Sequence, residues 1–192
     1  MIEHRPWVGD RYAGEGIDGQ RTAIMGYSSY TTENTEDYDG YTIECVSKVI
    51  SGVDRTMRFF NAIPGYFEMP AADFYRRVVF FEFVPRAVGG PEQKFAVATL
   101  EQAEAGRRRV LRIAQKHQIQ KLLVFSAKAW SSMPPMVEAA SGPLPSLPGT
   151  DFRMGTYDLD GVRAIAVGIR HPQNALKAQM RAAVQAALAL PI

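Results

Sequence analysis

Cysteine is nearly absent from this sequence. Cys45 is the only cysteine among 192 residues, which excludes an internal disulfide and a zinc site built from several cysteines. From its neighbours in the sequence we expect Cys45 to be a buried, structural thiol. No motif indicates a metal ion or an organic cofactor, and we expect neither.

Long hydrophobic runs are missing as well. The longest, such as Val78 to Val84 with Glu82 inside it, are far too short to span a bilayer. The first ten residues contain no apolar core of the kind that a signal peptide needs. We therefore expect a soluble, cytoplasmic protein with no membrane partner.

The sequence also lacks a strong excess of either charge. Lys and Arg together number 22 and Asp and Glu 20, so the formal net charge is only +2. This balance permits nucleic-acid binding but does not indicate it by itself. Hydrophobic residues, in contrast, make up 46% of the chain and include ten Phe. That is enough for the core of a single domain over residues 1–192.

Four short apolar stretches predict strands. They are Thr22 to Gly26, Arg77 to Val84, Lys121 to Ser126 and Val162 to Gly168. Because their apolar residues run almost without interruption, we expect a parallel sheet with helices on both faces. Helical segments fall between them, as in β-α-β units. The predicted fold class is α/β: a three-layer α/β/α domain with a short, mostly parallel four-stranded sheet.

The clearest helix is predicted from Thr99 to Lys116. Thr99 and Gln102 match a capping box, in which each side chain binds a backbone N–H of the first turn. For Arg107 to Arg109, an exposed helix face is favoured over contact with phosphate. The expected buried stripe consists of Leu100, Ala103, Val110, Leu111 and Ala114.

Three further helices are predicted, and two other segments have a distinct composition. The helices are Tyr41 to Ile50, Thr56 to Ile63 and Asn174 to Leu190, the last with Leu176, Met180, Ala183, Val184 and Ala187 on one face. Ser131 to Gly149 contains five Pro and is expected to be an irregular surface segment. Trp7, Gly9 and Tyr12 are expected to cover an edge of the sheet, with stacking on a ligand as the alternative.

Polar and aromatic residues gather where strands are expected to end. Gly26 to Thr31 (GYSSYT) follows the first strand, Arg170 to Asn174 (RHPQN) follows the fourth, and Glu82 interrupts the second. In an open parallel sheet, ligands bind beyond the carboxyl ends of the strands. We therefore expect the functional site there.

These segments resemble motifs of the uracil-DNA glycosylase superfamily. GYSSYT resembles the water-activating loop of that family, written GQDPYH in its best-known branch. HPQNAL resembles the leucine-loop motif HPSPLS, and KLLVFSAKAW resembles the third-strand segment of relatives. The motifs occur in the family's order over about Trp7 to Ala187. The resemblance implies the uracil-DNA glycosylase-like fold and a DNA glycosylase, a hydrolase of N-glycosidic bonds in DNA repair.

The resemblance also implies roles for individual residues. Ser28 falls where the family places its water-activating Asp, and His171 matches the His that donates to the base O2 as negative charge develops. Gly26 allows close approach of the nucleotide, and Tyr30 crowds the pyrimidine C5. Glu82 lies near the Asn that reads the uracil edge. The other residues expected at the base are Tyr27, Ser29, Pro172, Gln173 and Asn174.

DNA is the partner that the resemblance implies. The wedge that fills the vacated base stack falls on Ala175 or, with a slip of one residue, on Leu176. Arg170, Lys177 and Arg181 flank the start of the final helix, where they and the helix N-terminus are expected to approach phosphates.

The departures from the family pattern have chemical consequences. A Ser hydroxyl at position 28 cannot act as a carboxylate base without help, although it can orient a water. An ionised Glu82 only accepts hydrogen bonds, so it repels uracil O4 and suits an exocyclic amine. Ala175 is too small for a wedge. A non-catalytic module that binds a nucleotide or nucleic acid is therefore the alternative to a glycosylase.

A third interpretation is a small serine hydrolase, since Ser28, Asp158 or Asp160, and His171 occur in the α/β-hydrolase order. Each residue also has a structural interpretation. Ser28 and Ser29 would cap a following helix, His171 would pack or cap, Glu82 would face solvent, and Tyr27 and Tyr30 would cover the core. The functional interpretation requires the Ser pair and His171 to face each other across one cleft.

Overall fold

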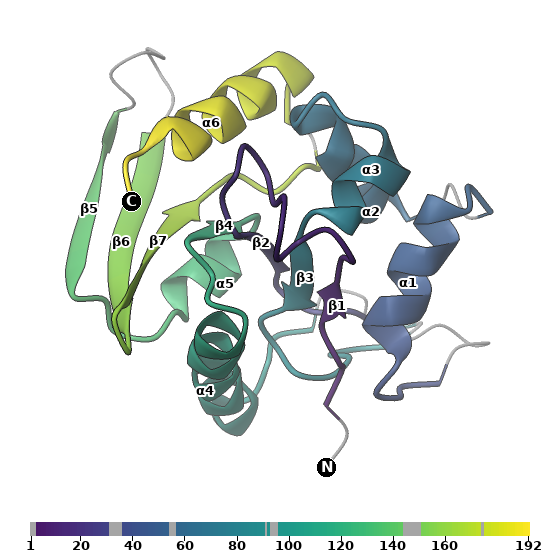
Figure 1. The fold of residues 1–192 in the computed structure, drawn as a ribbon. Coiled ribbons are helices and arrows are strands. Elements are labelled where there is room, and N and C mark those ends of the chain that lie inside the picture. The colour runs from purple at the N-terminus through teal and green to yellow at the C-terminus, as the bar shows by residue number, and fades with distance from the viewer. Residues whose placement is uncertain are drawn as a thin grey trace.

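The computed structural model describes residues 3–30, 36–53, 57–90, 92, 96–143, 151–173 and 175–192. Their strands form one seven-stranded sheet in the order β1-β3-β2-β4-β7-β6-β5 (Figure 1). Across these ranges, the structure contains no helix with the length and apolarity needed to cross a membrane.

The four predicted strands form the centre of the sheet. They are β2 (Thr22–Gly26), β3 (Val79–Glu82), β4 (Lys121–Val124) and β7 (Val162–Gly168). The pairs β2·β3, β2·β4 and β4·β7 are all parallel. The prediction of a parallel α/β core is therefore confirmed.

The prediction of four strands is wrong, because three antiparallel strands extend the sheet. β1 (Trp7–Val8) pairs with β3, so the expected role of Trp7 at a sheet edge is confirmed. β6 (Asp151–Leu159) pairs with β7, and β5 (Glu138–Pro143) with β6. The expectation of irregular structure from Ser131 to Gly149 is therefore wrong over β5. Its residues 138–141 are exposed and show no apolar alternation, so only pairing with β6 defines the strand.

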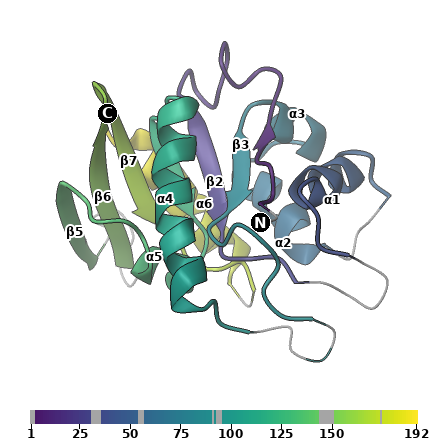
Figure 2. The same cartoon turned by 90° about the horizontal axis from the view of Figure 1, so that it is seen from below.

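Helices cover both faces of the central strands, which gives three layers (Figure 2). One face carries α4 (Leu100–Lys116) and α5 (Ala127–Ser131). The other carries α1 (Tyr41–Ile50), α2 (Arg58–Ala62), the 3₁₀ turn Ile63–Tyr66, α3 (Ala71–Arg76) and α6 (Lys177–Ala189). In β2, Ala23 and Met25 face the first layer and Ile24 the second, and all three are fully buried. This two-sided burial explains why the strands are continuously apolar.

The buried faces of the helices differ in part from those predicted. Leu100 is 86% exposed and Leu111 is 36% exposed, whereas Arg109 is fully buried. Arg109 lies 5.9 Å from the centre of the Phe81 ring and pairs with Glu3, so the expectation of an exposed face is wrong at this position. In α6, Met180, Val184 and Ala187 are buried as predicted, but Leu176 is 66% exposed. Cys45 is buried, as expected.

The predicted capping box of α4 is confirmed. Thr99 Oγ1 accepts from the Gln102 backbone N–H at 3.2 Å, and Gln102 Oε1 accepts from the Thr99 N–H at 2.8 Å. Thr99→Ala should lower the free energy of unfolding by about 1 kcal/mol, because one N–H of the first turn loses its acceptor. Urea denaturation of this variant beside Thr99→Ser, which keeps the hydroxyl, measures the effect. Equal losses in both variants would contradict it.

Candidate functional site

The carboxyl ends of the parallel strands lie side by side, as the site hypothesis requires. Gly26 is opposite Glu82, Met25 is opposite Val124, and Val124 is opposite Gly168. The ends of β2 and β7 are thus two strand spacings apart, about 10 Å, with the end of β4 between them. The loop after β2 and the segment after β7 therefore leave the sheet at the same edge.

The chain after β2 continues alongside the chain after β3. The Gly26 carbonyl accepts from Phe83 N–H at 3.0 Å, and the Ser29 carbonyl accepts from Val88 N–H at 2.9 Å. Ser28 is half-buried and Ser29 is buried. Neither serine caps a described helix, because the next helix described is α1, whose N-cap is Gly40.

The two tyrosines of this loop have different environments. Tyr27 stacks on Phe83 with ring centres 6.4 Å apart, and its hydroxyl accepts from Ala98 N–H at 3.1 Å. Lys128 Nζ lies 5.7 Å from the Tyr27 ring. Tyr27 is therefore held against the α4 face of the sheet. Tyr30 is 43% exposed, which leaves it as the tyrosine that a ligand can reach.

Glu82 is the most unusual group at this edge. It is only 4% exposed, so the interpretation as a solvent-facing residue is wrong. Its Oε2 is buried without a hydrogen-bond partner in the described part of the chain. Burial raises the pKa of the carboxyl to about 7, although the Arg109 charge opposes the shift. A Cβ on Gly26 would overlap this carboxyl, so the Gly at the end of β2 makes room for it.

His171 lies three residues beyond β7 and has a defined tautomer when neutral. Its Nδ1 accepts from the Gln173 backbone N–H at 3.1 Å, so the ring hydrogen is on Nε2. The ring centre is 5.3 Å from that of Phe59 in α2, and desolvation lowers the pKa of the imidazole, which favours this neutral form. The side chain still has an exposed surface. His171 therefore presents Nε2–H as a hydrogen-bond donor, while its Nδ1 also caps the local turn.

The residues expected at DNA fall into two groups. Arg170, Leu176 and Lys177 are exposed, and Leu176 is the N-cap residue of α6. Ala175 packs against the core instead, and Arg181 pairs with Glu68 at 3.1 Å. Of the two residues expected as the wedge, only Leu176 therefore has an exposed side chain. Of the remaining predicted site residues, Pro172 is half-buried, Gln173 is exposed, and Asn174 is outside the described residues.

The structure separates the acidic residues of the hydrolase hypothesis from His171. Asp158 accepts from the Gly161 N–H in the turn before β7, and Asp160 accepts from the Gln115 side chain near the end of α4. Both aspartates lie at the amino end of β7, about 20 Å from its carboxyl end. They cannot orient the imidazole, so the proposed triad is wrong.

Sequence analysis missed several residues of this edge. Arg58 precedes Phe59, whose ring contacts that of His171. Lys128 lies in α5, which begins just after the end of β4, and Arg153 is opposite Gly168 in the sheet. Arg58, Arg153 and Arg170 are exposed and form no ion pair with any described residue. Of the missed residues, only Lys128 lies within a segment that resembles a family motif, KLLVFSAKAW.

Several arginines elsewhere are paired, for example Arg76 with Asp10 at 2.7 Å and Arg77 with Glu15 at 2.8 Å. The edge that carries His171 therefore has uncompensated positive charge among the described residues, and so does α4, where Arg107 and Arg108 are exposed without an ion pair to a described residue. Among the described residues, no three His, Cys, Asp or Glu side chains form a group suited to a metal ion. Neither a protein-family model nor a curated protein matches this chain.

Proposed function

We propose that the carboxyl edge of the parallel strands binds a nucleobase of DNA and hydrolyses its N-glycosidic bond. The observation that carries this proposal is the neutral His171, whose Nδ1 is occupied by a backbone N–H and whose Nε2–H is left to donate. A neutral donor aimed at a base oxygen stabilises the negative charge that develops as the base departs. The resemblance to uracil-DNA glycosylases assigns the same role to this residue.

In this proposal Glu82 contacts the base and Ser28 contacts the attacking water. With a pKa of about 7, much of Glu82 is a neutral acid at neutral pH and can donate as well as accept. This changes the expectation from the sequence, because a neutral acid accommodates a keto oxygen that a carboxylate would repel. Ser28 is half-buried in the loop after β2 and would orient a water without serving as its base. We therefore expect slow turnover.

The remaining features of this edge suit a nucleic-acid strand. The exposed cations Arg58, Arg170 and Lys177 supply favourable contacts to phosphate. Leu176 is 66% exposed just beyond His171 and has the size to fill the space of an extruded base. Exposed Tyr30 offers a face on which a base can stack.

The test is single-turnover base release from oligonucleotides that carry uracil, hypoxanthine or xanthine. The chain should release at least one of these bases, and His171→Ala should slow release by about 100-fold, the usual loss when one oxyanion donor is removed. His117→Ala is the matched control, because His117 lies at the other end of the sheet, where its carbonyl accepts from Tyr12.

The outcomes separate the proposal from its alternative. Binding of the oligonucleotides without base release, weakened by His171→Ala, would identify a non-catalytic nucleobase-binding module. The presence of Ser at position 28, where the family has a carboxylate, favours this alternative. Equal release by both variants, or no binding by the wild-type chain, would refute a role for this edge.

A further inference from the structure

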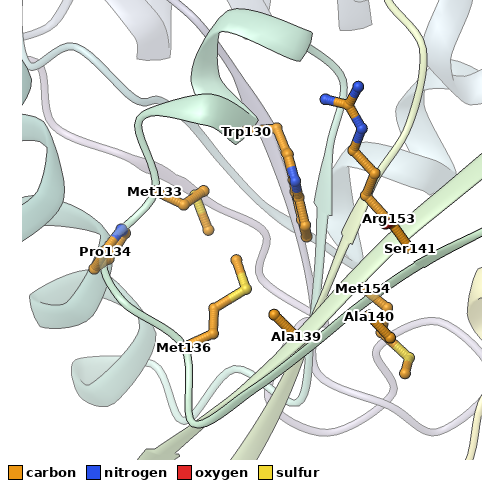
Figure 3. Close-up of a pocket in the computed structure, with 9 residues that line it drawn as sticks. All are labelled: Trp130, Met133, Pro134, Met136, Ala139, Ala140, Ser141, Arg153 and Met154. Atoms are coloured by element: carbon orange, nitrogen blue, oxygen red, sulfur yellow. The ribbon is translucent and has the colours of Figure 1, made fainter.

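A hollow lies between α5 and the β5–β6 pair, near the carboxyl end of β7. Its volume is about 460 Å³, which is in the range of ligand sites. Figure 3 shows Trp130 between Met133 and Met136, on one side, and Arg153, on the other. We propose that this hollow, called here the Trp130 groove, binds a further nucleotide of the same DNA strand, with its base on Trp130 and its phosphate against Arg153.

The position of the Trp130 groove connects it to the candidate site, and the proposal therefore rests on the proposed function. Trp130 lies against Gly168, the last residue of β7, where a Cβ would come within 2.8 Å of a ring carbon. His171 follows three residues later, a stretch that spans at most about 10 Å. Trp130 packs on the α4 face of the sheet and Phe59, whose ring contacts His171, on the other face, so a strand whose base lies at His171 reaches the groove by passing over the end of β7.

The shape of the groove depends on glycines within strands. Gly168 allows the Trp130 ring to lie flat on β7, and a Cβ on Gly155 of β6 would overlap Met136. Glycine inside a strand often marks a place of close approach. The result is an aromatic and thioether surface, and both groups are polarisable and favour stacking of a flat ring.

The charge of the groove selects the chemistry of its occupant. Arg153 is its one charged lining residue, is exposed, and pairs with no acid in the described ranges. Glu138 is the one acidic residue of β5, and it pairs with Arg163 at 2.9 Å rather than with Arg153. A ligand with a flat apolar ring and a negative group, which is the composition of a nucleotide, satisfies both parts of the lining. A purely apolar peptide would leave Arg153 without a partner.

The experiment uses Trp130 as its own reporter. The chain has two Trp, so Trp7→Phe leaves Trp130 as the only one. Titration with a single-stranded oligothymidylate of about ten nucleotides should quench Trp130 fluorescence, and one of about three nucleotides, too short to fill both places, should bind more weakly.

Variants then measure the contribution of each group to affinity. Trp130→Ala should weaken binding of the longer oligonucleotide by about tenfold, in line with the usual contribution of one stacked base. Arg153→Gln should lower the slope of log affinity against log salt by about one. Arg163→Gln, the same change on an exposed arginine away from the groove, should leave both quantities unchanged.

The outcomes distinguish this inference from the proposed function. Tight binding that is indifferent to Trp130→Ala and to oligonucleotide length would overturn the groove and leave the base site standing. Failure of the wild-type chain to bind either oligonucleotide would overturn the groove, and the base-release assay would decide the proposed function separately. A change of oligomeric state in Trp130→Ala, measured by sedimentation, would assign the groove to a second copy of the chain and overturn the inference.

Discussion

Glu82→Gln should raise the free energy of unfolding by about 3 kcal/mol at pH 8 and leave it almost unchanged at pH 4. Burial raises the pKa of Glu82 from 4.5 to about 7 in the folded chain. Below pH 4.5 the carboxyl is protonated in both states, so its burial costs little. As the pH rises from 4.5 to 7, the unfolded state loses this proton while the folded state keeps it. Stability therefore falls across this window, by about 1.4 kcal/mol for each pH unit.

Glutamine has the size of the protonated acid and no proton to lose, so it removes this penalty. Urea denaturation at several pH values between 4 and 8 measures the difference between the variant and the wild-type chain. Glu104→Gln is the control, because Glu104 is exposed on α4 and should give a difference near zero at every pH. A difference for Glu82→Gln that stays constant from pH 4 to pH 8 would show that the carboxyl is not buried in solution.

Gly9→Ala should lower the free energy of unfolding by about 3 kcal/mol, the upper end of the usual cost of overpacking. A Cβ at this position would overlap the backbone carbonyls of Tyr75 and Arg76. The Gly9 N–H donates to the Val78 carbonyl at 3.0 Å, so the segment cannot move away without losing this bond. The Trp7 indole, which donates to the Tyr75 carbonyl at 2.6 Å, should become more exposed.

Thermal or urea denaturation, followed by Trp fluorescence, tests this expectation. Gly14→Ala is the matched control in the same segment, because a Cβ there would meet no described atom within 4 Å. It should change the free energy of unfolding by less than about 0.5 kcal/mol. Similar losses in both variants would mean that β1 is not packed on β3 as the structure has it.

The central strands and several helices could be predicted from the sequence because their signals are local. β2 and β7 have the predicted bounds, and so does α1 (Tyr41–Ile50). Continuous apolar runs report burial on both faces of a sheet, and the Thr99 capping box specifies a helix start within four residues. β5 could not be predicted, because its exposed residues gain strand structure only from pairing with β6.

The residues of the candidate site, too, could be predicted only in part. The sequence placed the loop after β2, Glu82 and His171 at strand ends, and the parallel register brings Gly26 and Glu82 together. It did not indicate Phe59 or Arg153, which reach this edge from α2 and from β6. Phe59 and His171 are 112 residues apart, and Arg153 faces Gly168 only through the pairing of β6 with β7, so no local pattern encodes either contact.

The sequence alone determined which strands lie in the core, that they are parallel, and which of their ends carries polar groups. Uninterrupted apolar runs report burial on both faces, and the alternation of strands with helices reports the chain direction. Only the tertiary structure decided the charge state of Glu82 and the proton position on His171. Protonation depends on the surroundings of each group: the packing that removes water from Glu82, and the backbone N–H that occupies Nδ1 of His171. Those surroundings come from residues that are brought together by folding.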